Sequence, residues 1–217
     1  NKALAEQGVR IITRADGVYL WDDEGNRLLD GMAGLWCVNL GYGRRELIEA
    51  ASRQLEELPY YNTFFQSATP PAIELSAMLA EVTPEGFNQV FFANSGSEAN
   101  DTIVKMVRYY WNLQGKPTKK TIISRDFAYH GVTMAAASLS GLPAMQKPFD
   151  LPLEKFAHTA APYWYKYGHG LTPEEVGLAT ARALETKIEE LGAENVAAFI
   201  GEPIMGAGGL IVPPDNY

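Results

Sequence analysis

The sequence predicts an α/β protein with a mostly parallel sheet, and two observations lead to this fold class. From residue 89 onward, strand-like apolar runs alternate with helical segments; the runs are QVFFAN (89–94), TKKTIISRD (118–126) and NVAAFIGEPI (195–204). The segments 97–115 and 172–192 have apolar residues at helical spacing and are long enough to cross between parallel strands. Strands that alternate with helices of this length indicate a parallel sheet.

The ends of the two long helices are marked in the sequence. The first follows Ser95 and is closed by Gly115, and the second starts at a Thr172 cap, with Pro173 next to it. Between them, GVTMAAASLSG (131–141) predicts a short helix. The Pro-rich stretch 143–171 predicts irregular structure.

The N-terminal part has a different pattern. GVYLW and RLLDG, joined by the turn residues DDEGN, predict a hairpin within 17–34. Apolar stripes predict helices over 44–58 and about 72–81, separated by the aromatic, turn-rich YYNTFFQSATPP. We therefore expect an N-terminal α+β segment over 1–67 and the first part of a larger, incomplete α/β domain over 68–217.

Composition excludes several classes of protein. The net charge of −8 and the pI near 4.9 argue against nucleic-acid binding, which needs a basic face. No apolar run is long enough to predict a membrane span, and Cys37 is the single cysteine, which favours a reducing, cytoplasmic compartment. The three histidines lie far apart in the sequence, and we predict no metal site.

The turn NSGSE (94–98) permits two interpretations that do not exclude each other. Ser95 and Glu98 have the spacing of a capping box, which would only start a helix. The free N–H groups of a helix start after a parallel strand also bind anions, with Gly96 allowing close approach and Ser97 offering a hydroxyl. The turn matches neither a Walker loop nor GxGxxG.

Polar residues also follow the next two predicted strands, at the same edge of the sheet. Tyr129 and His130 come after TIISRD; the tyrosine could stack on a flat ring or simply cap the next helix. Glu202 ends AAFIGE, where a buried charge would need a partner, although an exposed loop position is the alternative. Trp36 and Phe64, from aromatic loops, could line an apolar pocket or belong to the core.

Three motifs in this order, SGSEAN, YHG and GEP followed by GAGG, resemble the class III aminotransferases, which use pyridoxal 5′-phosphate (PLP). The resemblance covers essentially the whole chain, and GVYLWDDEGNRLLDGMAGLWCVNLGYG is similar to the N-terminal hairpin and first active-site loop of that family. The aromatic residues most resemble the omega-transaminases, which transfer an amino group from an amine or β-alanine to pyruvate. The fold implied is PLP-dependent fold type I, a three-layer αβα sandwich.

The resemblance implies a role for each matching residue. Gly96 and Ser97 would hold the PLP phosphate, Tyr129 would stack on the ring and touch the substrate, and His130 and Glu202 would lie beside the cofactor. Trp36 and Ala207 would shape the substrate pocket. Phe64 would reach it from the neighbouring subunit of a homodimer, and a tetramer stays open.

No lysine of the chain lies in the setting that the family uses for the Schiff base, so that catalytic residue is expected beyond Tyr217, as is the aspartate that pairs with the pyridine nitrogen. The 217 residues alone are expected to be inactive. Two alternatives remain: an aminomutase or decarboxylase on the same scaffold, or a non-catalytic domain that binds a phosphate ligand.

Overall fold

The computed structural model describes residues 2–217, and the chain divides into two compact units, Asn1–Val90 and Phe91–Tyr217. We call them the N-terminal unit and the C-terminal unit, and each is described by itself. The predicted division of the complete protein at residues 67 and 68 stays a prediction.

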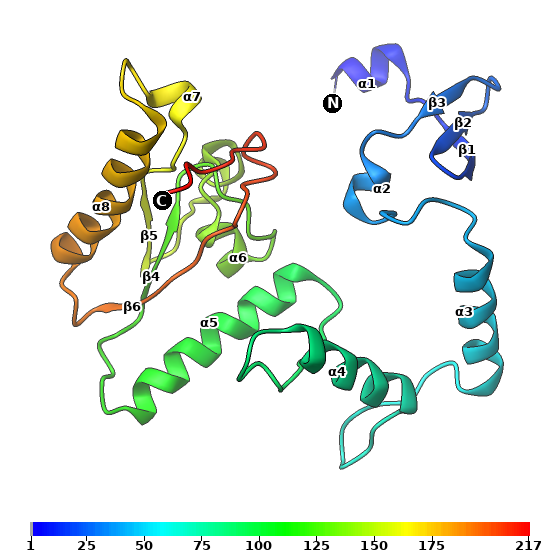
Figure 1. Ribbon diagram of the computed structural model, residues 1–217, viewed down its shortest axis with the longest axis horizontal. Helices are drawn as coiled ribbons and strands as arrows, with labels where there is room; N and C mark the ends of the chain where they lie inside the picture. Colours follow the sequence, from blue (N-terminus) through cyan, green and yellow to red (C-terminus); the bar gives the residue numbers. More distant parts are fainter. Residues whose placement is uncertain (1) are drawn as a thin grey trace. The chain divides into compact units, whose positions relative to one another are not determined.

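The N-terminal unit consists of a small antiparallel sheet and helices (Figure 1). Its elements are α1 (Lys2–Gln7), β1 (Ile12–Asp16), β2 (Tyr19–Asp22), β3 (Arg27–Leu29), α2 (Ala33–Trp36), α3 (Arg45–Glu57) and α4 (Pro70–Val82). The strands pair in the order β1-β2-β3, so the predicted hairpin is confirmed, and the sequence pattern did not predict β1. The two predicted helices are confirmed as α3 and α4.

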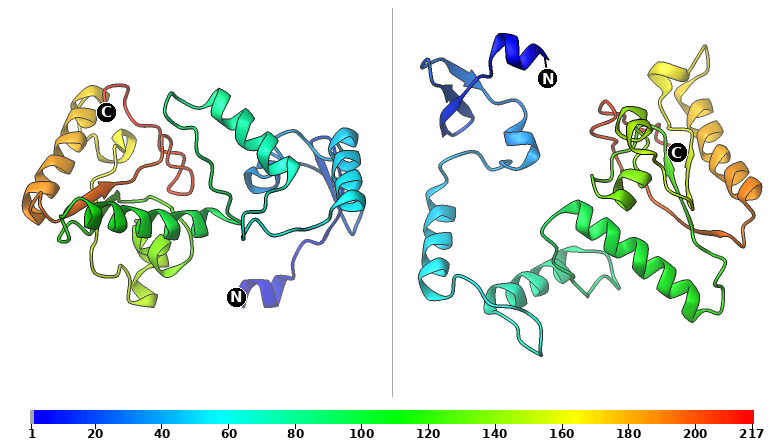
Figure 2. Two further views of the ribbon diagram at one scale, coloured as in Figure 1. Left: turned by 90° about the horizontal axis from the view of Figure 1, so that it is seen from below. Right: turned by 180° about the vertical axis from the view of Figure 1, so that it is seen from behind.

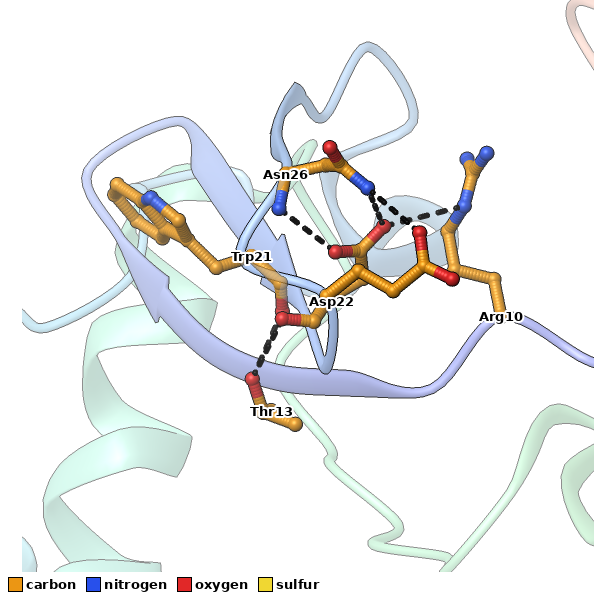
Figure 3. A network of polar contacts seen from close by, with 6 residues as sticks. Arg10, Thr13, Trp21, Asp22 and Asn26 are labelled. Atoms are coloured by element: carbon orange, nitrogen blue, oxygen red, sulfur yellow. Dashed lines mark hydrogen bonds and ion pairs between the residues drawn. The ribbon is translucent and has the colours of Figure 1, made fainter.

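Asp22 organises the turn between β2 and β3 (Figure 3). Its carboxylate accepts hydrogen bonds from the Asn26 backbone N–H at 2.8 Å and from Asn26 Nδ2 at 3.1 Å. Arg10 Nε lies 3.7 Å from the same carboxylate, and the Thr13 hydroxyl donates to the Trp21 carbonyl at 3.2 Å. A polar network thus fixes this hairpin.

The C-terminal unit is built on a parallel sheet with the strand order β5-β4-β6. Its elements are α5 (Gly96–Leu113), β4 (Thr121–Arg125), α6 (Met134–Leu139), the 3₁₀ turns η1 (Pro143–Met145) and η2 (Lys147–Phe149), β5 (Phe156–Thr159), α7 (Trp164–Tyr167), α8 (Pro173–Leu191) and β6 (Val196–Phe199). The helix α8 lies on one side of the β4–β5 pair and α6 on the other (Figures 1 and 2). The predicted parallel α/β arrangement is confirmed.

Two apolar clusters form the core of the C-terminal unit. Val104 of α5, Ile122 of β4 and Leu139 of α6 pack together, which fixes α5 and α6 against the sheet. Near the carboxyl ends of the strands, Ala128 and Met205 pack in a second cluster. These contacts place the start of α5 and the strand ends in one compact body.

Two predicted segments differ from the structure. QVFFAN (89–94) forms no strand, because a strand requires a ladder partner and no segment within residues 2–217 pairs with it. The stretch 143–171 is not irregular throughout, since Phe156–Thr159 forms β5 along the edge of β4. This four-residue strand is too short to show a clear period in the sequence.

None of the helices described within residues 2–217 combines the length and apolar character that a membrane span requires.

Candidate functional site

The start of α5 is a capped helix terminus. The Ser95 Oγ accepts a hydrogen bond from the Glu98 N–H at 3.2 Å, and the Glu98 carboxylate reaches back to accept from the Asn94 N–H at 2.9 Å. The capping interpretation is therefore confirmed, with the return bond one residue earlier than in a standard capping box. The Glu98 carboxylate is held at the Asn94 N–H, so it does not occupy the backbone N–H groups of Gly96 and Ser97.

The first turn of α5 leaves backbone donors free. The N–H groups of Gly96 and Ser97 have no hydrogen-bond acceptor within the described part of the chain. They lie at the positive end of an 18-residue helix dipole. A Cβ added to Gly96 would meet no atom within 4 Å, so the approach to these donors is open. The arrangement favours an anion.

The Ser97 side chain connects α5 to the turn after β4. Its hydroxyl oxygen accepts from the Val132 N–H at 3.0 Å, which leaves the hydroxyl hydrogen to be donated elsewhere. Gly131, at φ +131°, makes this approach possible, because a Cβ there would lie 2.5 Å from Ser97 Oγ. The site thus offers two backbone N–H groups and one O–H group, a donor set that fits a phosphate.

Two side-chain bonds hold the same turn against the helix. Asn100 Nδ2 donates to the His130 carbonyl at 2.6 Å, and the Thr133 hydroxyl donates to Asp101 Oδ1 at 2.7 Å. The residues after β4 are therefore fixed to the first two turns of α5.

Glu202 is bound to both neighbouring loops. Its Oε1 accepts from the Tyr129 N–H at 3.1 Å and its Oε2 accepts from the Gly206 N–H at 3.3 Å. The buried Arg125 guanidinium donates to the Glu202 backbone carbonyl. Glu202 is therefore a fixed, partly buried carboxylate that joins the Tyr129 turn to the segment that contains Ala207.

His130 is buried at the same edge, with 8% of its surface exposed. The backbone N–H of His130 donates to Ser140 Oγ at 2.9 Å, while its ring Nε2 has no partner among the described residues. Burial, together with the charges of Arg125 and His158, lowers the pKa of His130 to about 4. The imidazole is neutral at pH 7, and its Nε2 is buried without a partner among the described residues.

Ala207 lies in a closed loop after β6. Met205 and Ile211 exchange two backbone hydrogen bonds of 3.0 Å, and the side chain of Met205 is fully buried. A Cβ on Gly208 would overlap the Phe127 carbonyl, so this loop packs directly on the turn after β4. Ala207 itself is exposed.

The structure thus brings Gly96, Ser97, Tyr129, His130, Glu202 and Ala207 to one end of the parallel sheet. The roles of these residues toward a ligand stay predictions. The sequence interpretation missed Arg125 and Asn100. Arg125 ends an apolar strand, where a buried charge needs a partner, so the sequence carried a signal for it like the one at Glu202.

Trp36 and Phe64 belong to the N-terminal unit. Both side chains are exposed there, and neither belongs to a buried core cluster of the described chain. Trp36 ends α2, where all four residues have positive φ, between 48° and 69°. The position of either aromatic ring relative to the strand ends stays a prediction.

Known proteins resemble this chain over its full described length. The model of the family "Aminotransferase class-III" matches residues 3–217. A putrescine–pyruvate aminotransferase from Pseudomonas aeruginosa is 58% identical over 216 residues, which are 100% of this chain and 47% of that protein. The chain spans about half the length of the curated relatives it matches.

Solved structures agree with this match. An omega-transaminase from Pseudomonas jessenii in complex with PMP has a TM-score of 0.96 and 49% identity, covering 100% of this chain and 48% of that one. An (S)-enantioselective omega-transaminase from Thermomicrobium roseum has a TM-score of 0.95, with the same identity and coverage. The predicted PLP-dependent fold type I is confirmed, with part of its sheet in this chain. The chain belongs to the class III aminotransferase family.

Proposed function

We propose that the complete protein is a PLP-dependent aminotransferase that moves an amino group from an amine or omega-amino acid to a keto acid such as pyruvate. Class III aminotransferases use PLP, and one related structure is in complex with PMP. The observation that carries the proposal is the donor set at Gly96 and Ser97, on the same sheet edge as Tyr129 and Glu202.

The residues of this chain would bind and orient the cofactor. The N–H groups of Gly96 and Ser97 and the Ser97 hydroxyl would hold its phosphate, and the Tyr129 ring would stack on its pyridine. Neutral His130 and the fixed carboxylate of Glu202 would complete its polar surroundings. When bound, PLP supplies the electron sink for chemistry at the substrate α-carbon.

Substrate recognition would come from Trp36, Ala207 and Tyr129, with Phe64 contributed by the second subunit of a homodimer. The relative from Pseudomonas aeruginosa is named for putrescine and pyruvate, which supports a diamine or other primary amine as donor. The Schiff-base lysine would lie beyond Tyr217. We also propose a cytoplasmic location, supported by the single cysteine.

The aminomutase and decarboxylase alternative gains no support, because the relatives described above are all aminotransferases.

The proposal is tested by assaying the complete protein with pyruvate and either 1-phenylethylamine or putrescine. We expect alanine to form together with the carbonyl product. Tyr129→Phe should retain PLP absorbance while turnover falls, because the ring still stacks but the hydroxyl is lost. Absence of alanine with both donors would contradict the proposed function, and a Tyr129→Phe protein that fails to fold would assign the tyrosine a structural role.

A further inference from the structure

The loop that carries Trp36 has an unusual backbone. Ala33, Gly34, Leu35 and Trp36 have φ values of 48°, 61°, 63° and 69°, which make one left-handed turn. The Trp36 N–H donates to the Met32 carbonyl at 2.8 Å, so the turn is hydrogen-bonded internally. Left-handed backbone is disfavoured for residues other than glycine and persists where the surroundings hold it in place.

The Asp30 carboxylate holds this turn. Its Oδ1 accepts from the Met32 N–H at 3.0 Å, and its Oδ2 accepts from the Gly34 N–H at 2.8 Å and from the Tyr42 hydroxyl at 2.7 Å. The bond from Tyr42, followed by the bond from Gly34, lowers the pKa of Asp30. The carboxylate therefore stays ionised and able to accept all three bonds near neutral pH.

Asp30 and Tyr42 are both hydrogen-bonded to the backbone of the turn between β1 and β2. The Asp30 N–H donates to the Val18 carbonyl at 2.9 Å, and Tyr42 and Gly17 exchange two backbone hydrogen bonds of 2.8 and 3.1 Å. The Tyr42 side chain also packs closely against the left-handed turn, because a Cβ on Gly34 would lie 2.9 Å from the Tyr42 hydroxyl oxygen. A continuous chain of contacts thus runs from the β1–β2 turn through Tyr42 and Asp30 to the left-handed turn that carries Trp36.

The Trp36 side chain does not pack into the unit that supports it, since 60% of its surface is exposed. A large apolar ring on a strained, externally braced turn is suited to contact a ligand rather than to fill a core. The hydrogen bonds to the turn matter because a side chain held in its binding position loses less conformational entropy when it contacts a ligand.

We propose that Asp30 is a positioning residue, which fixes the left-handed turn so that Trp36 is held for contact with the apolar substituent of the amine donor. The inference rests on the proposed function. It assigns discrimination between bulky apolar amines and small donors to a carboxylate that touches no substrate.

Asp30→Asn in the complete protein tests the inference. The amide keeps the shape but replaces one acceptor with an N–H₂ group, so either the Met32 N–H or the Gly34 N–H loses its acceptor. We expect the KM for 1-phenylethylamine to rise on the order of tenfold, below the roughly hundredfold that a misplacement of about 1 Å can cost. The KM for alanine and the PLP absorbance should change little. Asp23→Asn, an exposed aspartate in the neighbouring turn, is the matched control and should behave like the wild type.

A double-mutant cycle separates positioning from general stability. In a Trp36→Ala background, Asp30→Asn should have almost no further effect on the KM for 1-phenylethylamine, because the side chain it positions is gone. Equal losses in both backgrounds, or a loss that is the same for both donors, would overturn the inference. If Asp30→Asn does not fold, Tyr42→Phe removes one of the three bonds and should raise the same KM by a smaller factor; an unchanged KM would overturn the inference. A wild-type protein with no transaminase activity would instead refute the proposed function.

Discussion

In the C-terminal unit, Ile123 and Leu139 are almost completely buried, whereas in the described part of the N-terminal unit the one buried side chain is that of Asp22. The C-terminal unit is ordered by apolar packing between helices and a parallel sheet. In the N-terminal unit, carboxylates accept hydrogen bonds from the backbone N–H groups of two turns: Asp22 in the hairpin and Asp30 in the left-handed turn.

Because of this difference, we expect the two units to be sensitive to different kinds of substitution. A packed core loses free energy when volume is removed, because the cavity cannot fully collapse. A hydrogen-bonded turn loses its conformation when an acceptor is removed, with little change in buried area. The predicted ligand-binding residues of the C-terminal unit are supported by a packed apolar core. Trp36 is supported by a hydrogen-bonded turn.

The largest effect is expected from Ile123→Ala in β4. The side chain has 0% of its surface exposed, so its removal should lower the free energy of unfolding by about 2–5 kcal/mol. Leu29→Ala in β3, where 70% is exposed, should change it by about 0.5 kcal/mol or less. Denaturant unfolding of the two variants of the complete protein measures the contrast. Similar losses would show that the N-terminal unit also depends on apolar burial.

The next effect concerns the buried His130. In the unfolded chain this imidazole gains a proton below its ordinary pKa of 6.5, but in the folded protein only below about 4. The stability present above pH 6.5 should therefore fall by about 2–3 kcal/mol as the pH drops to 4. His130→Phe should remove this part of the pH dependence. Parallel stability profiles for the two proteins between pH 7 and 4 would contradict the prediction.

Ser97→Ala and Ser95→Ala separate phosphate binding from helix capping. Loss of the Ser97 hydroxyl should weaken PLP retention by roughly 1–2 kcal/mol, the scale of a charge-assisted hydrogen bond. Loss of the Ser95 cap should lower stability by about 1 kcal/mol with a smaller effect on retention, because its oxygen is used by the Glu98 N–H. Cofactor titration and thermal unfolding measure the two effects. The same retention in both variants would count against the phosphate role of Ser97.

The smallest effect is expected at the Asp22 turn. The side-chain hydrogen bond from Asn26 is the main cause that lowers the pKa of Asp22 below 3.8. The carboxylate therefore stabilises the turn above its ordinary pKa, and this contribution is lost as the pH falls through the lower folded value. The protection factor of the Asn26 amide, which corrects the exchange rate for its intrinsic pH dependence, should fall at acid pH in the wild type and should already be low at neutral pH in Asp22→Asn. Equal exchange in both proteins at neutral pH would show that the turn does not need the charge.

Local sequence signals predicted elements whose ends are set by nearby residues. The helix α8 begins at the predicted Thr172 cap, where Thr172 and Glu175 form a complete capping box, and α5 begins directly after Ser95. Segments that depend on distant partners were predicted less well. The strand expected at 89–94 is not formed, and β5 was missed. The left-handed turn had no signal, because three of its four residues are not glycine.

The sequence by itself determined the helix caps, the parallel α/β order and the residues that follow each strand, because these depend on period and on contacts within a few positions. The tertiary structure decided how those residues meet. The Ser97 oxygen accepts a bond from Val132, 35 positions away, and the Glu202 carboxylate accepts one from Tyr129, 73 positions away. Such bonds exist only after apolar packing has brought the strand ends together, so no local pattern could specify them.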